Sequence, residues 1–225
     1  METSKKIRVC NAYCGVGGNR KNWTDVDVTA IELDENIAAI YQDFFPNDKV
    51  IVGDAHEYLL KHFNEFDFVW SSPPCPTHSR TNYFLKARNI IRYPDMKLWQ
   101  EIILLQTHFQ GRYCVENVIS YYGAMLNPQE VARHYFWTNF FIVPFYSTYK
   151  IGKMNGKNQR GGMDANVSKL EINLDKYELR NKRLLLRNCV EPALGKHIFD
   201  CAFNGKAQTL FESQEMIQDN LFAEV

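Results

Sequence analysis

Residues 66–80 have the sequence FDFVWSSPPCPTHSR. The apolar run at 66–70 predicts a buried strand, which must end abruptly at the following SSPPCP. Because proline fixes φ and cannot continue a strand or a helix, Cys75 is expected on a stiff, exposed bend. Open α/β sheets place their chemistry at the carboxyl ends of their strands. Cys75 is therefore a candidate nucleophile, and the alternative is a small buried apolar side chain, as free cysteines usually are.

Apolar runs alternate with helical patterns along the rest of the chain. Strands are predicted at residues 7–13, 28–33, 49–54, 66–70, 112–115 and 132–143. Helices are predicted at residues 35–45, at 98–109, and in the later part of 184–199 after a break at 188–192. This alternation predicts an α/β fold with a doubly wound, mostly parallel sheet in a chain of 225 residues.

The composition restricts the kinds of site to expect. The 26 Lys and Arg residues balance the 26 Asp and Glu residues, so a surface for nucleic acid must come from local segregation of charge. The six cysteines lack the paired spacing of a zinc site, and no metal is expected. With no signal peptide and no long apolar run, the chain is expected to be intracellular, with free thiols and no membrane contact.

A glycine-rich turn follows the first predicted strand, in the sequence CGVGGN at 14–19. There the backbone can approach a ligand closely and a helix can begin. Glu32 ends the second strand and Asp54 ends the third, and an acid after the second strand can accept hydrogen bonds from ribose hydroxyls. Alone, the glycines would indicate only a tight turn. Together, the three features predict a site for an adenosine cofactor.

A carboxyl side chain follows the fifth predicted strand. Residues 112–115 run into Glu116-Asn117-Val118, which places Glu116 on the same edge of the sheet as Cys75. A carboxyl group in such a cleft can act as an acid, and the alternative is an ordinary exposed glutamate.

Two segments carry basic residues and no acid. Residues 77–92 also contain two aromatic side chains and can close over a polyanion, and residues 150–162 (KIGKMNGKNQRGG) can address base edges or phosphates. The alternatives are a solvated loop for the first segment and a flexible loop for the second. The candidate nucleic-acid contacts are Arg80, Lys86, Arg88, Lys150, Lys153, Lys157 and Arg160.

In this order, the motifs resemble the DNA (cytosine-5) methyltransferase family. The matching sequences are YCGVGG at 13–18, ELD at 32–34, GD at 53–54, PPC at 73–75, ENV at 116–118 and RNCVEP at 187–192. RHYFWTN at 133–139 resembles the compact arginine motif of short phage-type members. The resemblance therefore extends over about residues 7–199.

The resemblance implies a Rossmann-like fold that binds S-adenosyl-L-methionine and methylates cytosine in double-stranded DNA. In this reaction Cys75 would attack carbon 6 of a flipped cytosine, Glu116 would hold the ring nitrogen and amine, and Arg133 would support the base. The alternatives are methylation of cytosine in transfer RNA, and a catalytically silent module that binds nucleic acid. The cofactor residues implied are Tyr13, Gly15, Val16, Gly18, Glu32, Leu33, Asp54, Ala55, Pro74, Asn188 and Cys189.

The chain departs from the family pattern in three ways. Pro76 stands where many members have glutamine, and His134 occupies one of the two usual arginine positions. The third departure is a short segment at 144–186, where larger members have a target-recognition domain. We therefore expect a catalytic core at 1–143, a reduced recognition segment at 144–186, and a closing motif with a tail at 187–225. A minimal member of this kind is expected to be a monomer in the cytoplasm of a bacterial or phage-infected cell. Its expected setting is restriction-modification, with the presence of an accompanying nuclease left open.

Overall fold

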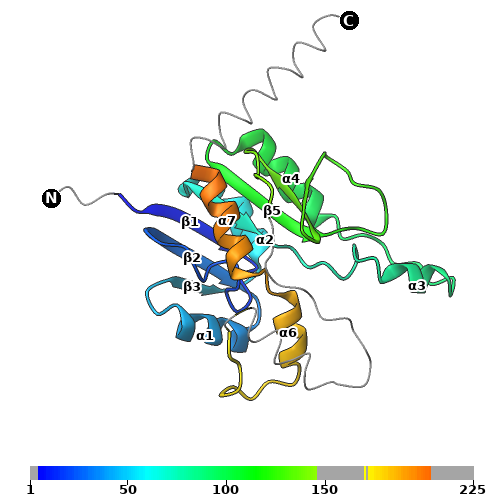
Figure 1. Ribbon diagram of the computed structural model, residues 1–225, viewed down its shortest axis with the longest axis horizontal. Coiled ribbons are helices and arrows are strands. Elements are labelled where there is room, and N and C mark those ends of the chain that lie inside the picture. The colour runs from blue at the N-terminus through cyan, green and yellow to red at the C-terminus, as the bar shows by residue number, and fades with distance from the viewer. Residues whose placement is uncertain (1–4, 146–169, 171, 204–225) are drawn as a thin grey trace, which may run out of the picture.

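A seven-stranded sheet forms the centre of the protein, with helices on both of its faces (Figure 1). The computed structural model describes residues 5–145, 170 and 172–203. The strands are β1 (Ile7–Ala12), β2 (Val26–Glu32), β3 (Lys49–Val52), β4 (Phe68–Ser71), β5 (Arg112–Val118), β6 (Gln129–Val131) and β7 (His134–Thr138). The helices are α1 (Glu35–Phe44), α2 (Ala55–His62), α3 (Asn82–Lys86), α4 (Lys97–His108), α6 (Lys182–Asn188) and α7 (Pro192–Phe203), with a 3-10 turn η1 (Phe63–Glu65).

The strand order is β3-β2-β1-β4-β5-β7-β6. The first five strands in this order pair in parallel, and β7 is antiparallel to both of its neighbours. The direction of winding reverses between β1 and β4, where Ala12 and Ser71 are aligned in register. The turns that follow these two strands therefore start at the same level, at the position where open α/β sheets bind ligands. The predicted α/β class and doubly wound sheet are confirmed.

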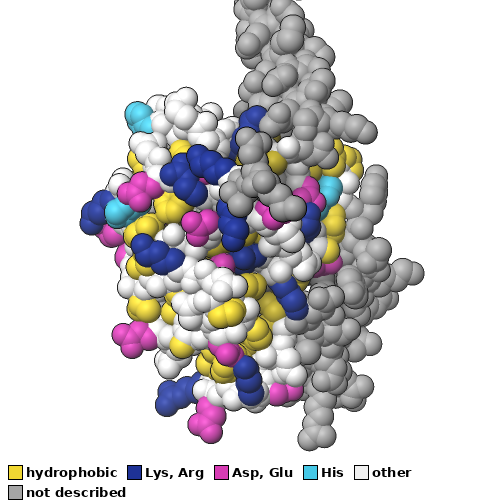
Figure 2. All heavy atoms as spheres, turned by 90° about the vertical axis from the view of Figure 1, so that its left-hand side faces the viewer, with side chains coloured by type: hydrophobic (Ala, Val, Ile, Leu, Met, Phe, Trp, Pro, Cys, Tyr) yellow, Lys and Arg dark blue, Asp and Glu magenta, His cyan; other side chains and the backbone are white. Residues whose placement is uncertain are grey.

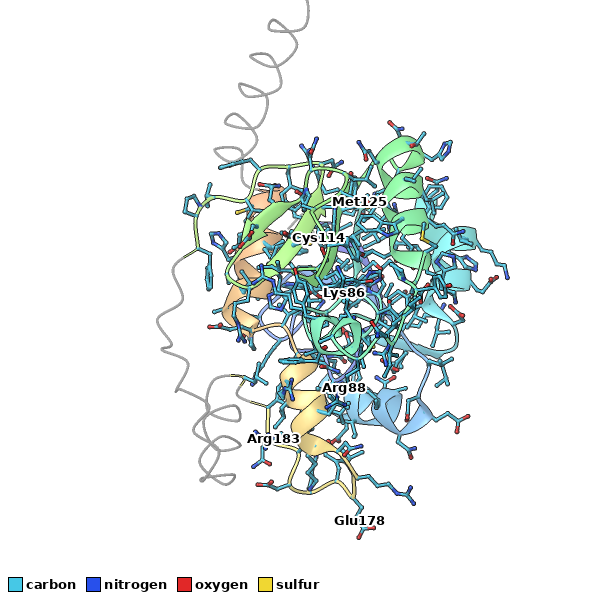
Figure 3. The ribbon with its side chains drawn as sticks, turned by 90° about the vertical axis from the view of Figure 1, so that its right-hand side faces the viewer. Lys86, Arg88, Cys114, Met125, Glu178 and Arg183 are labelled. Carbon is cyan, nitrogen blue, oxygen red and sulfur yellow. The ribbon has the colours of Figure 1, made fainter. Side chains whose placement is uncertain are left out.

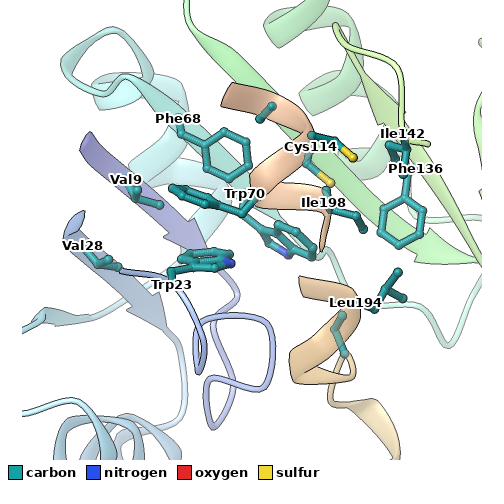
Figure 4. Close-up of a cluster of buried hydrophobic side chains, with 14 of the residues drawn as sticks. Val9, Trp23, Val28, Phe68, Trp70, Cys114, Phe136, Ile142, Leu194 and Ile198 are labelled. Atoms are coloured by element: carbon teal, nitrogen blue, oxygen red, sulfur yellow. The ribbon is translucent and has the colours of Figure 1, made fainter. Parts of the chain in front are cut away.

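Alternation along the strands builds a different core on each face of the sheet. On one face, α1 and α7 cover a cluster in which Trp23 stacks on Phe199 and lies near Trp70 (Figure 4). On the other face, α2 and α4 contribute Leu59 and Ile102, which are fully buried. These two cores hold the carboxyl ends of the strands in fixed positions.

Several element boundaries differ from the sequence predictions. Strand β5 continues to Val118, so Glu116 lies within the strand instead of after it. The segment predicted as a basic loop contains the short helix α3. The strand predicted at 132–143 ends earlier, at Thr138 in β7, although residues 140 and 142 beyond it are buried. No helix begins at the glycine turn: residues 13–25 form successive turns, because Gly15 (φ +53°) and Gly17 (φ +81°) have left-handed backbone conformations. The break between α6 and α7 agrees with the prediction.

The expected recognition segment, 144–186, falls partly outside the described residues, which omit 146–169 and 171. Its later part belongs to the core, since Ile172, Leu174 and Leu186 pack in one cluster with Val16 and Ile40. The expected boundary between 186 and 187 lies inside α6. In the part of the chain that the structure describes, no helix has the length and apolar character needed to cross a membrane.

Candidate active site

The turn after β4 presents Cys75 at the sheet edge. Asn117, which is almost fully buried in β5, donates from Nδ2 to the carbonyl oxygen of Pro73 at 2.9 Å. On the other side of the turn, the amide of Ser72 donates to the carbonyl of Ala12 at 3.3 Å. The turn is thereby tied to both neighbouring strands, β1 and β5. Cys75 is only partly buried, as a nucleophile that must reach a substrate requires.

Glu116 lies beside the cysteine turn on β5. Parallel pairing aligns Ser71 with Val115, so Glu116 is level with the first residue of the turn. Its carboxyl group is mostly buried, and its Oε1 is 3.7 Å from Nε2 of His134 on β7. The antiparallel register places His134 opposite Val118, diagonal to Glu116 on the same face of the sheet.

Burial and nearby charges together disfavour the thiolate form of Cys75. Burial and then the nearby charge of Glu116 raise the pKa of Cys75 above its ordinary value. Arg187 on α6 acts in the opposite direction and lowers it. Arg187 was part of the recognised closing motif, but the sequence carried no sign that it lies close enough to Cys75 to affect its ionisation.

The arginine expected to support the base lies next to the histidine that pairs with Glu116. Arg133 is exposed, in the tight connection between β6 and β7 where Ala132 has a φ of +56°. Within the described residues, the side chain that pairs with Glu116 is that of His134, and its other nitrogen, Nδ1, is buried there without a hydrogen-bond partner. The strand boundary explains the difference: Arg133 belongs to the turn before β7, whereas His134 is the first residue of β7 and is in register with Val118.

The segment after Cys75 is folded onto the turn. Asn82 at the start of α3 donates from Nδ2 to the carbonyl of Pro76 at 2.9 Å. The amide of Asp95 donates to Oγ1 of Thr77 at 3.0 Å, and the amide of Tyr121 donates to the carbonyl of His78 at 3.0 Å. The first two bonds lie within the segment, and the third joins it to the loop that follows β5.

Helix α3 projects from the rest of the structure (Figure 1). Its side of the molecule displays Lys86 and Arg88, which are exposed, as Arg80 is (Figure 3). Large apolar side chains in the same segment are also exposed, with Phe84 at 73% and Tyr93 at 80%. On the opposite side, basic and acidic side chains are mixed (Figure 2). The other candidate contacts, Lys150, Lys153, Lys157 and Arg160, lie outside the described residues.

The acids at the ends of β2 and β3 lie where the sequence predicted them. Glu32 accepts hydrogen bonds from the amides of Gly15 at 3.0 Å and Leu33 at 2.9 Å. Asp54 caps α2 through Oδ1, and its Oδ2 is 3.0 Å from Nζ of Lys97 on α4. A ligand amine that approached Asp54 would share this oxygen with Lys97, a partner that sequence reasoning missed.

The surface beside these acids is open and partly apolar. A Cβ atom at Gly15 or Gly53 would meet nothing within 4 Å, so the region in front of both turns is open. Leu33 is 71% exposed, and Val52, which is paired with Glu32 on the adjacent strand, is 51% exposed. Apolar surface beside a carboxylate suits a flat base joined to a ribose. Val52 was missed because its position beside Glu32 is visible only once the register is known.

The closing motif lies directly against the glycine turn. A Cβ atom at Gly18 would be 2.5 Å from the carbonyl oxygen of Val190 and 3.0 Å from Cβ of Cys189. Only glycine permits this approach. Burial raises the pKa of Cys189 to about 12, which makes that thiol unreactive, while Asn188 beside it is exposed.

The other expected cofactor residues differ in their exposure. Tyr13 is partly buried and has a φ of +57°, and Pro74 is exposed. Val16 and Ala55 are each only 2% exposed and belong to two different core clusters. In the described part of the chain, no cluster of three or more His, Cys, Asp or Glu residues is arranged to hold a metal ion.

Comparison with known proteins identifies the family. A model of the C-5 cytosine-specific DNA methylase family matches residues 7–120, a region that includes both Cys75 and Glu116. The chain belongs to this family. None of the curated proteins that were compared matches it.

Several solved structures are similar to part of this family member. A methyltransferase of Entamoeba histolytica matches with 17% identity and a TM-score of 0.34, over 51% of this chain and 39% of that one. A DNA modification methyltransferase encoded within an E. coli prophage matches with 21% identity and a TM-score of 0.35, over 51% and 33%. DNMT2 of Spodoptera frugiperda matches with 21% identity and a TM-score of 0.35, over 50% and 36%.

Proposed function

We propose that this protein is a DNA (cytosine-5) methyltransferase that uses S-adenosyl-L-methionine. The observation that carries the proposal is the bond from Asn117 to the carbonyl of Pro73, which joins the Cys75 turn to the strand of Glu116. A nucleophile and a carboxyl group thus lie at one sheet edge, next to the open region in front of Gly15.

The cofactor would supply an electrophilic methyl group. Glu32 would accept hydrogen bonds from the ribose hydroxyls, while Leu33 and Val52 would pack against the adenine. Asp54 would accept from the adenine amine, sharing its carboxylate with Lys97.

The cysteine would provide nucleophilic catalysis. The Cys75 thiolate would add to carbon 6 of the cytosine, and the electron pair would move to carbon 5. Glu116 would hydrogen-bond the ring nitrogen and the exocyclic amine, which favours this build-up of charge. Carbon 5 would then accept the methyl group, which leaves S-adenosyl-L-homocysteine. A base would remove the proton of carbon 5, and the electrons of that C–H bond would re-form the double bond to carbon 6 and expel the Cys75 thiolate. Because a stacked base cannot reach this turn, the target must be flipped out of the helix.

Support for the base would come from β7. His134 is paired with Glu116 and is the better placed of the two neighbouring basic residues, whereas Arg133 is exposed. We therefore propose that His134 orients Glu116 and that Arg133 contacts the nucleic acid outside the active site.

The projecting segment around α3 would contact DNA. Exposed Arg80, Lys86 and Arg88 would neutralise phosphates, and the exposed ring of Phe84 offers an apolar surface to the bases. Lys150, Lys153, Lys157 and Arg160 remain proposed contacts of the same kind.

Methyl transfer from labelled S-adenosyl-L-methionine tests the substrate. We expect incorporation into duplex DNA and none into transfer RNA. Incorporation into RNA alone would contradict the proposal in favour of the RNA-directed activity.

Covalent trapping tests the mechanism and separates it from a silent binding module. Wild-type protein should form a denaturant-stable adduct with DNA that contains 5-fluorocytosine. Cys75→Ser should abolish the adduct and keep cofactor binding, and Cys201→Ser, which alters a buried thiol on α7, should keep both. A wild-type protein that binds DNA and cofactor but forms no adduct would indicate the silent module.

A further inference from the structure

A buried carboxylate on α4 lies behind the cofactor edge. Glu101 has no exposed surface, although a charged side chain is rarely buried without partners. Its Oε1 accepts a hydrogen bond from Oη of Tyr13 at 2.7 Å and is 2.8 Å from Nδ1 of His56. Its Oε2 accepts from Oγ of Ser71 at 2.5 Å. The three partners use both oxygens of the group.

The partners come from three different elements of the sheet edge. Tyr13 follows β1, His56 lies in the first turn of α2, and Ser71 ends β4. Through them, one side chain of α4 connects the glycine turn, the helix capped by Asp54 and the strand that leads to Cys75. One helical turn earlier, Lys97 of the same helix pairs with Asp54.

His56 offsets the free-energy cost of burying the Glu101 carboxylate. It is 5% exposed, and its hydrogen bond with Glu101 raises the pKa of the imidazole. The protonated form of His56 is thus favoured beside Glu101, and a partner of opposite charge offsets the cost of burying a carboxylate. Burial and the charge of Glu101 also raise the pKa of Tyr13, so the phenol keeps its proton and donates a hydrogen bond to the carboxylate.

We infer that Glu101 is a positioning residue for the cofactor: through its bond to Oη of Tyr13, it holds the tyrosine ring in the orientation that packs against the adenosine group. The inference rests on the proposed function, because Tyr13 is expected to contact S-adenosyl-L-methionine. Tyr13 has a left-handed backbone conformation, which is uncommon for a bulky residue, so its side chain needs a fixed partner to keep one orientation. Glu101 is the hydrogen-bond partner of its hydroxyl group.

The test removes the hydroxyl group and keeps the ring. Tyr13→Phe should raise the Kd for S-adenosyl-L-methionine about tenfold, since one hydrogen bond to a charged group orders the ring. Calorimetry on the full chain without nucleic acid measures this Kd. At saturating cofactor, kcat should stay within about twofold of wild type, so that the effect appears in KM.

Tyr41→Phe is the matched control. The hydroxyl group of Tyr41 is also buried and donates to a carboxylate, that of Asp48, at 2.9 Å. Tyr41 lies on α1, however, on the face of the sheet opposite α4. Its loss should lower the melting temperature and leave the Kd unchanged. Glu101→Gln should weaken cofactor binding, and combining it with Tyr13→Phe should add little, because both changes break the same contact.

The outcomes distinguish this inference from the proposed function. If Tyr13→Phe melts earlier but binds the cofactor as tightly as wild type, Glu101 only stabilises the fold and the inference is wrong. If the wild-type protein binds no S-adenosyl-L-methionine, the proposed function fails and the inference fails with it. If the cofactor binds with the expected tyrosine effect but no methyl transfer follows, the inference holds and the proposed function does not.

Discussion

The reactivity of Cys75 depends on two charges of opposite sign. Glu116→Gln removes a negative neighbour and should lower the pKa of the thiol, whereas Arg187→Gln should raise it. The pH dependence of alkylation by iodoacetamide, followed by mass spectrometry, measures this pKa directly. In wild type, the rate of alkylation should rise with pH, and the midpoint of this rise should lie above the ordinary thiol pKa of about 8.5. Identical profiles for wild type and Glu116→Gln would show that the two groups do not interact.

The same geometry assigns different weights to two adjacent basic residues. His134→Ala should lower kcat about tenfold or more, because it removes the group paired with Glu116. Arg133→Ala should leave kcat close to wild type, and any effect should appear as weaker DNA binding that depends on salt. Steady-state kinetics with duplex DNA separates the two variants. A larger loss of kcat for Arg133→Ala would show that the arginine reaches the base when DNA is bound.

Strand β5 positions the site because asparagine side chains form hydrogen bonds with the backbone at both of its ends. Asn117 bonds the cysteine turn at the active-site end, while Asn139 holds the start of the strand through Nδ2 to the carbonyl of Gly111 at 2.9 Å. Asn117→Ala should cost about 1–3 kcal/mol of unfolding free energy and also lower kcat, since the turn loses its anchor.

Asn139→Ala is the comparison for that variant. It should cost a similar amount of stability in denaturant unfolding and keep kcat at the wild-type value. Equal kinetic losses in both variants would mean that strand stability, and not the anchored turn, determines the rate.

At the scale of the whole molecule, α7 from the end of the chain packs against the turn after β1. A Cβ atom at Gly195 would be 2.4 Å from the carbonyl oxygen of Asn19, and the carbonyl of Gly195 accepts from Nε1 of Trp23 at 3.1 Å. Gly195→Ala should therefore cost about 1–3 kcal/mol despite the better helix propensity of alanine, because backbone atoms must separate.

This variant should also weaken cofactor binding, since Asn19 directly follows the glycine turn. Urea unfolding and calorimetry with S-adenosyl-L-methionine measure the two effects. Gly123→Ala, at an exposed position with nothing within 4 Å of the new atom, should change neither by a measurable amount. An unaltered Kd in Gly195→Ala would show that α7 supports the fold without supporting the cofactor edge.

Local patterns along the chain predicted the order of the parallel strands and the residues at their ends, but they missed α2, α3 and β6. Apolar runs that stop at glycine, proline or acid residues mark a strand and its carboxyl end together, because the same short segment determines both. For this reason Cys75, Glu32 and Asp54 were predicted from sequence at the edge where they lie. Their roles in binding and catalysis stay predictions.

Contacts between distant segments required the tertiary structure. The register of β5 and β7 brings His134 to Glu116. Packing of α4 against the sheet brings Glu101 to Tyr13, which is 88 positions away, and folding of α6 brings the charge of Arg187 to Cys75. No local pattern encodes these pairings, because hydrogen bonds and charge interactions act through space and each partner alone has the sequence signature of an ordinary polar residue.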